Sequence, residues 1–165
     1  MSREFRLITG SPSVTNMHMR RYLVRLAVRG PIRWLICGNH LDLQQLIYAV
    51  AQRAGVNYYH VLENNIAISR AETCHQVVAL LRKTKASGTP TFVSDLLLHF
   101  YDNKVRDDEA AELFFQGVQA LRQLSRAGPV IVSACAGPLR TQLDTMLRQN
   151  AGRITQFSAG YEHGS

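Results

Sequence analysis

The sequence predicts an α/β fold, in which a mainly parallel sheet is flanked by helices on both faces. One observation is that short, uniformly apolar segments alternate along the chain with longer segments whose apolar residues recur every three or four positions. A second is that strands without polar alternation are typical of parallel sheets covered on both faces. The third is length, because 165 residues suffice for one domain with a substantial core. We therefore expect a single domain over residues 1–165, with a flexible tail over residues 158–165.

Each strand is expected where a short apolar run ends at a glycine or polar residue, and each helix where apolar residues form a stripe. The expected strands are residues 5–8, 32–37, 66–69, 91–97, 130–134 and 153–157. The expected helices are residues 16–30, 43–54, 72–85, 107–126 and 138–149. Thr15 or Asn16 is expected to cap the first helix and Asp42 the second, because short polar side chains accept hydrogen bonds from the first turn of a helix.

The turn between the first strand and the first helix has the layout of a phosphate-binding loop, G-x-x-x-x-G-K-[ST]. If Gly10 is the first glycine, Thr15 stands at the second glycine, Asn16 at the lysine and Met17 at the metal-binding hydroxyl. A site without that lysine and hydroxyl lacks a charge for the β/γ-phosphates and a magnesium ligand. The predicted vestigial nucleotide site comprises Gly10, Ser11, Pro12, Ser13, Val14, Thr15, Asn16 and Met17. A plain Gly/Ser/Pro turn before a helix is the alternative.

Other strand ends support taking this turn as a site. Ligands of parallel α/β sheets bind beyond the carboxyl ends of the strands. Four of the expected strands end at residues 10–13, residues 38–40, Asp95 and residues 134–137. We therefore expect these four segments to converge on one site.

The net charge of +7 is concentrated near the start of the chain. Before Asp42, the only acidic residue is Glu4, whereas the arginines are Arg3, Arg6, Arg20, Arg21, Arg25, Arg29 and Arg33. The spacing of four residues between Arg21, Arg25 and Arg29 places them on one face of the expected first helix. Arginine favours bidentate contact with phosphate or carboxylate. This pattern indicates nucleic acid, an acidic protein partner, or an ordinary solvated helix face.

The order of these parts resembles the ATPase core of the RecA/RadA recombinases and their paralogues. Residues 43–81, LQQLIYAVAQRAGVNYYHVLENNIAISRAETCHQVVALL, are similar to the recombinase segment in which a helix ending in R-x-G leads through VLxNI to xxRAxTxxQ. FVSDLLLHFYD at residues 92–102 resembles the Walker B strand, with Asp95 at the metal-binding aspartate, and GPVIVSACAG at residues 128–137 resembles the strand that senses the γ-phosphate. The resemblance covers residues 5–157 and implies a RecA-like P-loop NTPase fold.

The chain departs from the family where the family keeps its catalytic residues. Besides the missing Walker A lysine and hydroxyl, Asn39 stands at the catalytic glutamate, and Cys135 and Ala136 stand at the polar pair that ends the sensor strand. Asp95 alone remains of the catalytic set, and an aspartate at the end of a strand can also simply cap a loop. We therefore expect no catalytic residue, no ATPase activity and no cofactor, with ATP·Mg²⁺ binding weak at best.

Two loops join the first helix as expected DNA contacts. Residues 101–106 lie where recombinases place their first DNA-binding loop, although the acidic residues 107–109 that follow oppose phosphate binding. The DNA-binding loop after the sensor strand is shortened to about residues 137–142. The predicted DNA-binding residues are Arg20, Arg21, Arg25, Arg29, Lys104, Arg106 and Arg140.

Three functions remain open at this point. The first is a recombinase paralogue with a decayed nucleotide site, which binds DNA without sequence preference, or a recombinase partner, as an accessory in homologous recombination and DNA repair. The second is an atypical ATP-binding protein or ATPase, in which the backbone N–H groups of residues 11–15 hold phosphate without a lysine. The third is a protein-interaction scaffold without DNA binding.

Composition excludes several other classes. No apolar run approaches the roughly 18 residues of a membrane span, and no signal sequence is recognisable, so we expect an intracellular protein of the cytoplasm, nucleoid or nucleus with no membrane partner. Cys37, Cys74 and Cys135 are expected to be buried, reduced thiols. Cys37 with His40, and Cys74 with His75, lack the second well-spaced pair of a zinc site, so no metal is expected.

Overall fold

In the computed structural model, which describes residues 4–38, 42–135, 137 and 139–157, the strands form one parallel sheet with the order β3-β2-β4-β5-β1-β6. The strands are β1 (Arg6–Gly10), β2 (Ile32–Ile36), β3 (Ile66–Arg70), β4 (Thr91–Ser94), β5 (Val130–Ala134) and β6 (Arg153–Phe157). The helices are α1 (Pro12–Ala27), α2 (Leu43–Ala54), α3 (Tyr58–His60), α4 (Cys74–Lys83), α5 (Asp107–Ala127) and α6 (Thr141–Asn150). The remaining helical turns are Gly55–Asn57, Val61–Asn65 and Leu98–Tyr101.

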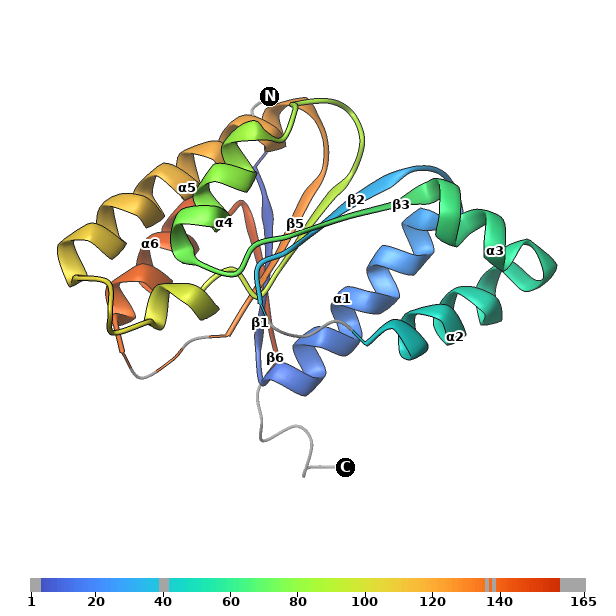
Figure 1. Cartoon of the computed structure of the whole chain (residues 1–165), viewed down its shortest axis with the longest axis horizontal. Helices are drawn as coiled ribbons and strands as arrows, with labels where there is room; N and C mark the ends of the chain where they lie inside the picture. The colour runs from blue at the N-terminus through green and yellow to red at the C-terminus, as the bar shows by residue number, and fades with distance from the viewer. Residues whose placement is uncertain (1–3, 39–41, 136, 138, 158–165) are drawn as a thin grey trace.

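The helices cover the sheet in two layers, with α1, α2 and α3 on one face and α4, α5 and α6 on the other (Figure 1). The strand pleat explains the division, because successive side chains point to opposite faces. Ile8 packs with Met19 and Leu23 of α1, whereas its neighbour Leu7 packs with Phe114 and other residues of the α4–α6 layer. The predicted α/β architecture is confirmed. No helix in the described part of the chain is long and apolar enough to cross a membrane.

Several element ends differ from the prediction, and most have a local backbone reason. The first helix begins at Pro12 instead of Asn16, because proline suits the first helical position, where no N–H is needed. The predicted cap at Thr15 or Asn16 was therefore wrong. The predicted cap at Asp42 is confirmed, since its carboxylate accepts a hydrogen bond from Gln45 N at 3.1 Å.

Two left-handed residues shorten other elements. β4 ends at Ser94 instead of Leu97 because Asp95 has φ +56°, which stops an extended strand. The last helix begins at Thr141 instead of Pro138 because Arg140 has φ +50°. Residue 138 itself lies outside the described residues, as do Arg3, Asn39, His40, Ala136 and the predicted tail.

Candidate functional site

The four strands whose ends were expected to converge do end at one edge of the sheet, although only Ser13 and Asp95 among the described residues of the expected segments line the cavity found there. The strands are parallel, so β1, β2, β4 and β5 end on the same side, at Gly10, Ile36, Ser94 and Ala134. A cavity of about 450 Å³ opens there, beside the first turns of α1 and the start of α2. Its lining residues are Ser13, Asn16, Met17, Met19, Arg20, Trp34, Asp42, Gln45, Ser94 and Asp95.

The connection from β1 to α1 is too short for a phosphate-binding loop. β1 ends at Gly10 and α1 begins at Pro12, so Ser11 is the whole connection. The predicted loop residues from Pro12 to Met17 are helical instead, and Thr15 N donates to Ser11 O at 2.9 Å as the first helical bond. Pro12 has no N–H to offer. The converging N–H groups of a phosphate cradle are therefore not assembled from these residues.

β6 also occupies the space beside this connection. Gly10 has φ +145°, and a Cβ placed on it would overlap the carbonyl oxygen of Phe157. Because no side chain can be accommodated there, only glycine at this position allows β6 to approach so closely. The same close approach leaves no room for a ligand on this side of Gly10.

Asp95 is packed into the carboxyl edge. Its N–H donates to Ser133 Oγ at 3.0 Å, and a Cβ placed on Gly38 would lie 2.6 Å from Asp95 Oδ2. The neighbouring Ser94 accepts a hydrogen bond from Trp34 Nε1 at 2.7 Å, inside the protein. The aspartate at the Walker B position is thus held by a backbone hydrogen bond, and its side chain packs closely against Gly38, just after β2.

The thiols near Asp95 are protonated at neutral pH. Burial raises the pKa of Cys37 to about 12, with the negative charge of Asp95 as the second cause. Burial and then Asp95 also raise the pKa of Cys135 above its ordinary value. A thiol whose pKa is raised stays protonated and is a poor nucleophile and metal ligand. Among the described residues, no cluster of three or more His, Cys, Asp or Glu residues is arranged to hold a metal.

The charges of the carboxyl-edge cavity do not suit a polyphosphate. Its described lining carries the carboxylates of Asp42 and Asp95 against the single guanidinium of Arg20. A bound triphosphate would face two negative charges with one counter-charge, in the absence of a lysine. The hypothesis of an atypical ATP site loses both its backbone cradle and its electrostatic support.

A second hollow, which we name the basic groove, has the opposite character. It lies between α1 and α2 and encloses about 850 Å³. Its lining residues are Arg20, Arg21, Val24, Arg25, Gln44, Gln45, Tyr48, Ala49, Gln52 and Arg53. No carboxylate is among them, and none of the four arginines forms an ion pair with a described residue.

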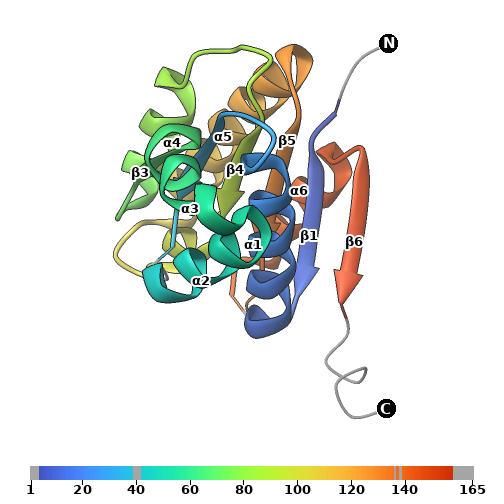
Figure 2. The same ribbon diagram turned by 90° about the vertical axis from the view of Figure 1, so that its right-hand side faces the viewer.

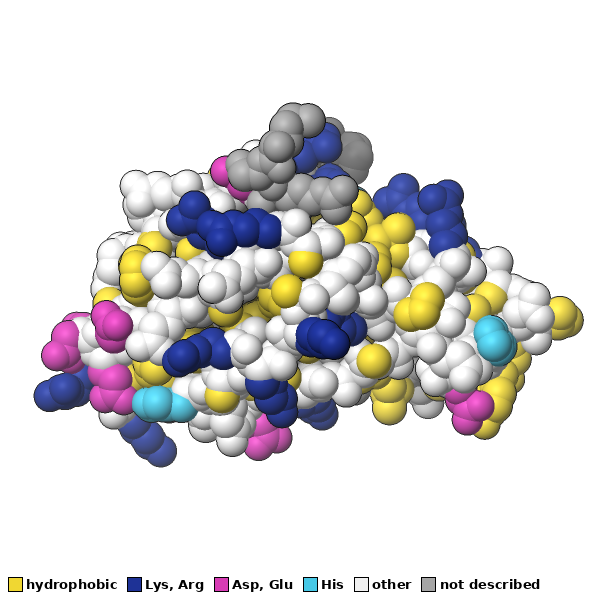
Figure 3. Space-filling view, turned by 90° about the horizontal axis from the view of Figure 1, so that it is seen from above, with side chains coloured by type: hydrophobic (Ala, Val, Ile, Leu, Met, Phe, Trp, Pro, Cys, Tyr) yellow, Lys and Arg dark blue, Asp and Glu magenta, His cyan; other side chains and the backbone are white. Residues whose placement is uncertain are grey.

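Two arginines in the opposite layer form ion pairs. Arg148 pairs with Asp144 at 2.8 Å, and Arg106 pairs with Asp108 at 3.5 Å. In the face of the molecule shown in Figure 3, acidic side chains gather mainly at the left-hand end, on the side of α4 and α5. The arginines of the basic groove differ from these two in having no carboxylate partner among the described residues, although exposed cations of the other layer such as Lys83 and Arg126 also lack one.

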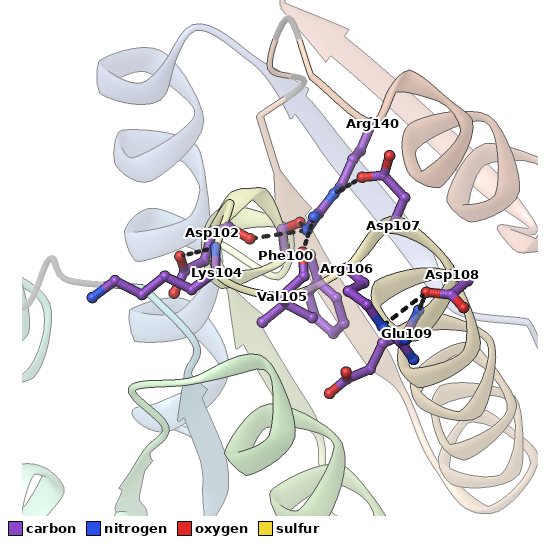
Figure 4. Close-up of polar contacts among 9 residues, drawn as sticks. All are labelled: Phe100, Asp102, Lys104, Val105, Arg106, Asp107, Asp108, Glu109 and Arg140. Atoms are coloured by element: carbon purple, nitrogen blue, oxygen red, sulfur yellow. Dashed lines mark hydrogen bonds and ion pairs between the residues drawn. The ribbon is translucent and has the colours of Figure 1, made fainter.

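Arg140, a predicted DNA-binding residue, is occupied inside the protein (Figure 4). Its side chain is 8% exposed, and its guanidinium donates to Asp107 Oδ1 at 2.9 Å. It also donates to the carbonyl oxygens of Phe100 at 2.7 Å, Asp102 at 3.1 Å and Val105. Four of the five N–H groups of Arg140 are thus engaged within the protein, which leaves little donor capacity for a phosphate and fixes the loop before α5.

The other predicted DNA-binding residues fall into two groups. Arg20, Arg21 and Arg25 line the basic groove, and Arg29 is exposed just beyond the end of α1. Lys104 and Arg106 lie in the loop that Arg140 holds, on the other side of the molecule, beside the acidic start of α5 (Figure 4). The structure thus brings together the arginines of the first helix and separates them from the loop residues.

Sequence reasoning missed the second wall of the groove. Gln44, Tyr48 and Gln52 recur every four residues along α2, and Gln52 Nε2 donates to Tyr48 Oη at 2.8 Å. This spacing is a polar stripe that the sequence displays, but it carries no charge run. Only the packing of α2 against α1 reveals that Arg53 joins the arginines of α1.

Comparisons with known proteins bear on the fold. No protein-family model matches the chain, and no curated protein matches it. Among solved structures, the ATPase domain of a RecA-fold helicase matches with a TM-score of 0.58 and 14% sequence identity, covering 99% of this chain and 73% of that one. The fold is RecA-like. At this identity the likeness supports a RecA-like P-loop ATPase fold and does not extend to a recombinase paralogue.

The features described above predict that this RecA-like chain does not hydrolyse ATP. Without a lysine or a phosphate cradle, we expect a loss of several kcal/mol of transition-state stabilisation. Release of phosphate from ATP·Mg²⁺ should stay at background, and any effect of millimolar ATP on the melting temperature should be the same in the wild type and in Asp95→Ala. Turnover that Asp95→Ala abolishes would contradict this expectation, and so would a rise of several degrees in melting temperature that Asp95→Ala abolishes.

Proposed function

We propose that this chain is a non-hydrolysing RecA-like protein that binds DNA through the basic groove, as an accessory in homologous recombination and DNA repair. The observation that carries the proposal is the groove itself, with four arginines, no lining carboxylate and no internal ion pair among the described residues. Such a surface attracts a polyanion, because folding has supplied no counter-charge for it.

The groove chemistry favours contact with the DNA backbone over reading of bases. Guanidinium groups bind phosphate oxygens bidentately, while the amides of Gln44, Gln45 and Gln52 offer donors to phosphate or sugar oxygens. Tyr48 is 66% exposed within the same lining and offers a ring on which any base can stack. Contacts of these kinds depend little on sequence, so binding should be sequence-tolerant.

A salt titration tests the proposal quantitatively. Four phosphate contacts predict that log affinity falls against log salt with a slope of about −3 to −3.6, for single- and double-stranded DNA respectively. This corresponds to a loss of about a hundredfold between 50 and 200 mM salt. The measurement is fluorescence anisotropy with labelled single- and double-stranded oligonucleotides of mixed sequence. A flat salt dependence would contradict backbone binding.

The double variant Arg21→Glu/Arg25→Glu should weaken DNA binding at least about tenfold, because two phosphate contacts are replaced by repulsion. The slope of log affinity against log salt should become shallower by about 2. Both residues lie at the surface, so unfolding should be little affected. Lys83→Glu/Arg126→Glu is the matched control, since these exposed residues make the same charge change in the other layer. Equal weakening by both pairs would assign binding to net charge rather than to the groove.

A protein partner is the competing function for the same surface. If the wild type does not bind DNA at low salt, the arginines of the groove would instead meet an acidic protein, such as a recombinase or another scaffold partner. The DNA titration therefore separates the two functions directly.

A further inference from the structure

A smaller cavity lies on the other flank of α1, between that helix and the strands β1 and β6, which Figure 2 shows side by side. It encloses about 190 Å³, and its lining residues are Arg6, Ile8, His18, Arg21, Tyr22, Arg25, Thr155 and Phe157. Three guanidinium groups from two elements face this space, and no carboxylate lies in its described lining. We name it the β1–β6 pocket.

The arginines of the β1–β6 pocket are positioned by stacking rather than by ion pairs. The guanidinium carbons of Arg6 and Arg25 lie 5.3 and 5.0 Å from the centroid of the Tyr22 ring. Stacking on an aromatic ring fixes a guanidinium plane and leaves its N–H groups available in that plane. Neither arginine forms an ion pair with a described residue.

Arg6 is left with unsatisfied hydrogen-bonding capacity. Its Nε atom is buried and has no hydrogen-bond partner among the described residues, and its Nη2 reaches Thr155 Oγ1 only at 3.5 Å. Orphaned buried donors are rare in folded proteins. A buried N–H aimed at no acceptor is explained when a ligand supplies the acceptor.

The neighbouring strand adds a further like charge. Arg6 and Arg153 are directly paired across β1 and β6, so their side chains leave the same face of the sheet. Like charges in such pairs are destabilising. The repulsion between the two arginines opposes folding, whereas a bound anion would offset it.

The walls of the pocket define the size of that anion. His18 stacks on Phe157 with ring centroids 3.9 Å apart, which closes one side. Burial, and then the charge of Arg21, lower the pKa of His18 below its ordinary value, so the positive charge of the pocket comes from the arginines. Typical ligand pockets measure roughly 300–1,000 Å³, so this one is too small for a nucleoside and suits a single tetrahedral anion.

We propose that the β1–β6 pocket binds a phosphate group, with Arg6, Arg25 and Arg21 as ligands and Thr155 as a hydroxyl donor. The phosphate group belongs either to a small free phosphate compound or to the 5′ end of a DNA strand. Arg21 and Arg25 line both this pocket and the basic groove, so a strand in the groove can place its terminal phosphate here. Phosphate binding itself does not depend on the proposed DNA binding.

Inorganic phosphate is the first probe, titrated at constant ionic strength against chloride. The melting temperature of the wild type should rise by about 4 °C at a phosphate concentration about ten times the dissociation constant. Arg6→Gln should lower phosphate affinity at least tenfold, as should Arg25→Gln, whose exposed position makes it the safeguard if the first variant folds poorly. Arg53→Gln, which changes only the groove, should bind phosphate as the wild type does.

The second probe separates the two sources of the phosphate. A 5′-phosphorylated oligonucleotide that binds more tightly than its 5′-hydroxyl counterpart, with the difference lost in Arg6→Gln and kept in Arg53→Gln, assigns the pocket to strand ends. Equal affinities of the two oligonucleotides, with phosphate binding intact, assign it to free phosphate compounds. The proposed phosphate site would be overturned if phosphate raised the melting temperature of the wild type no more than chloride does. It would also be overturned if Arg6→Gln left the phosphate affinity unchanged. Loss of DNA binding with phosphate binding retained would overturn only the proposed function.

Discussion

Replacing Arg140 with alanine is expected to lower the free energy of unfolding by about 2 to 4 kcal/mol, measured by urea unfolding. The guanidinium donates hydrogen bonds to the carbonyl oxygens of Phe100, Asp102 and Val105, and the Arg140 side chain is only 8% exposed. Removing it leaves these acceptors without their donor, and part of that cost is not recovered by water. Arg140→Lys should restore little, because one ammonium group cannot reproduce the planar fork of donors.

Two further variants separate the causes of this loss. Arg140 has φ +50°, so alanine at this position keeps the backbone strain that arginine already carries, whereas glycine relieves it. Arg140→Gly should therefore be less destabilising than Arg140→Ala by about 1 kcal/mol. Arg106→Ala is the control from the same loop, because its ion pair with Asp108 is exposed and should contribute under about 1 kcal/mol. An Arg140→Ala variant as stable as Arg106→Ala would show that the guanidinium does not hold the loop.

The strands were the most predictable part of the fold. Val130–Ala134 and Arg153–Phe157 have the predicted bounds, since short apolar or β-branched runs between breakers leave little choice of register. The helical turns over residues 55–65 were not predicted, and several other errors arose at single residues. Asp95 and Arg140 adopt left-handed conformations that no local sequence pattern predicts. Pro12 is the first residue of a helix, whereas the Gly/Ser/Pro sequence favoured a loop.

The site was less predictable because charge in a sequence does not reveal burial. Arg25 and Arg140 look alike as arginines near expected binding loops, yet one is exposed and lines two cavities while the other is enclosed by its neighbours. The four-residue spacing along the first helix correctly placed Arg21 and Arg25 together, but Arg29 lies beyond the end of α1 and does not line the groove. Their partner wall on α2 and the contribution of Arg6 from β1 depend on packing between elements, which spacing along one element cannot show.

Replacing Gly38 with alanine is expected to destabilise the fold by about 2 to 3 kcal/mol, because the added methyl would lie 2.5 Å from Asp95 Cβ. Both residues are held by neighbouring strands, since Cys37 N donates to Ser94 O at 2.9 Å, so neither backbone can withdraw easily. Gly30→Ala is the matched control, as a Cβ there meets nothing within 4 Å. Urea unfolding of both variants provides the measurement.

The Asp95→Gly background tests whether Asp95 is what fills the carboxyl edge. Glycine suits the left-handed backbone at this position, where φ is +56°, and it removes the atoms that the new methyl would strike. Gly38→Ala should therefore cost much less in Asp95→Gly than in the wild type, with a coupling energy of about 2 kcal/mol in a double-mutant cycle. An unchanged cost would mean that Asp95 yields freely, and that the space beside Gly38 is open to a ligand. A large coupling would mean that the aspartate at the Walker B position serves to close this edge, which leaves the α1 arginines as the surface available for anions.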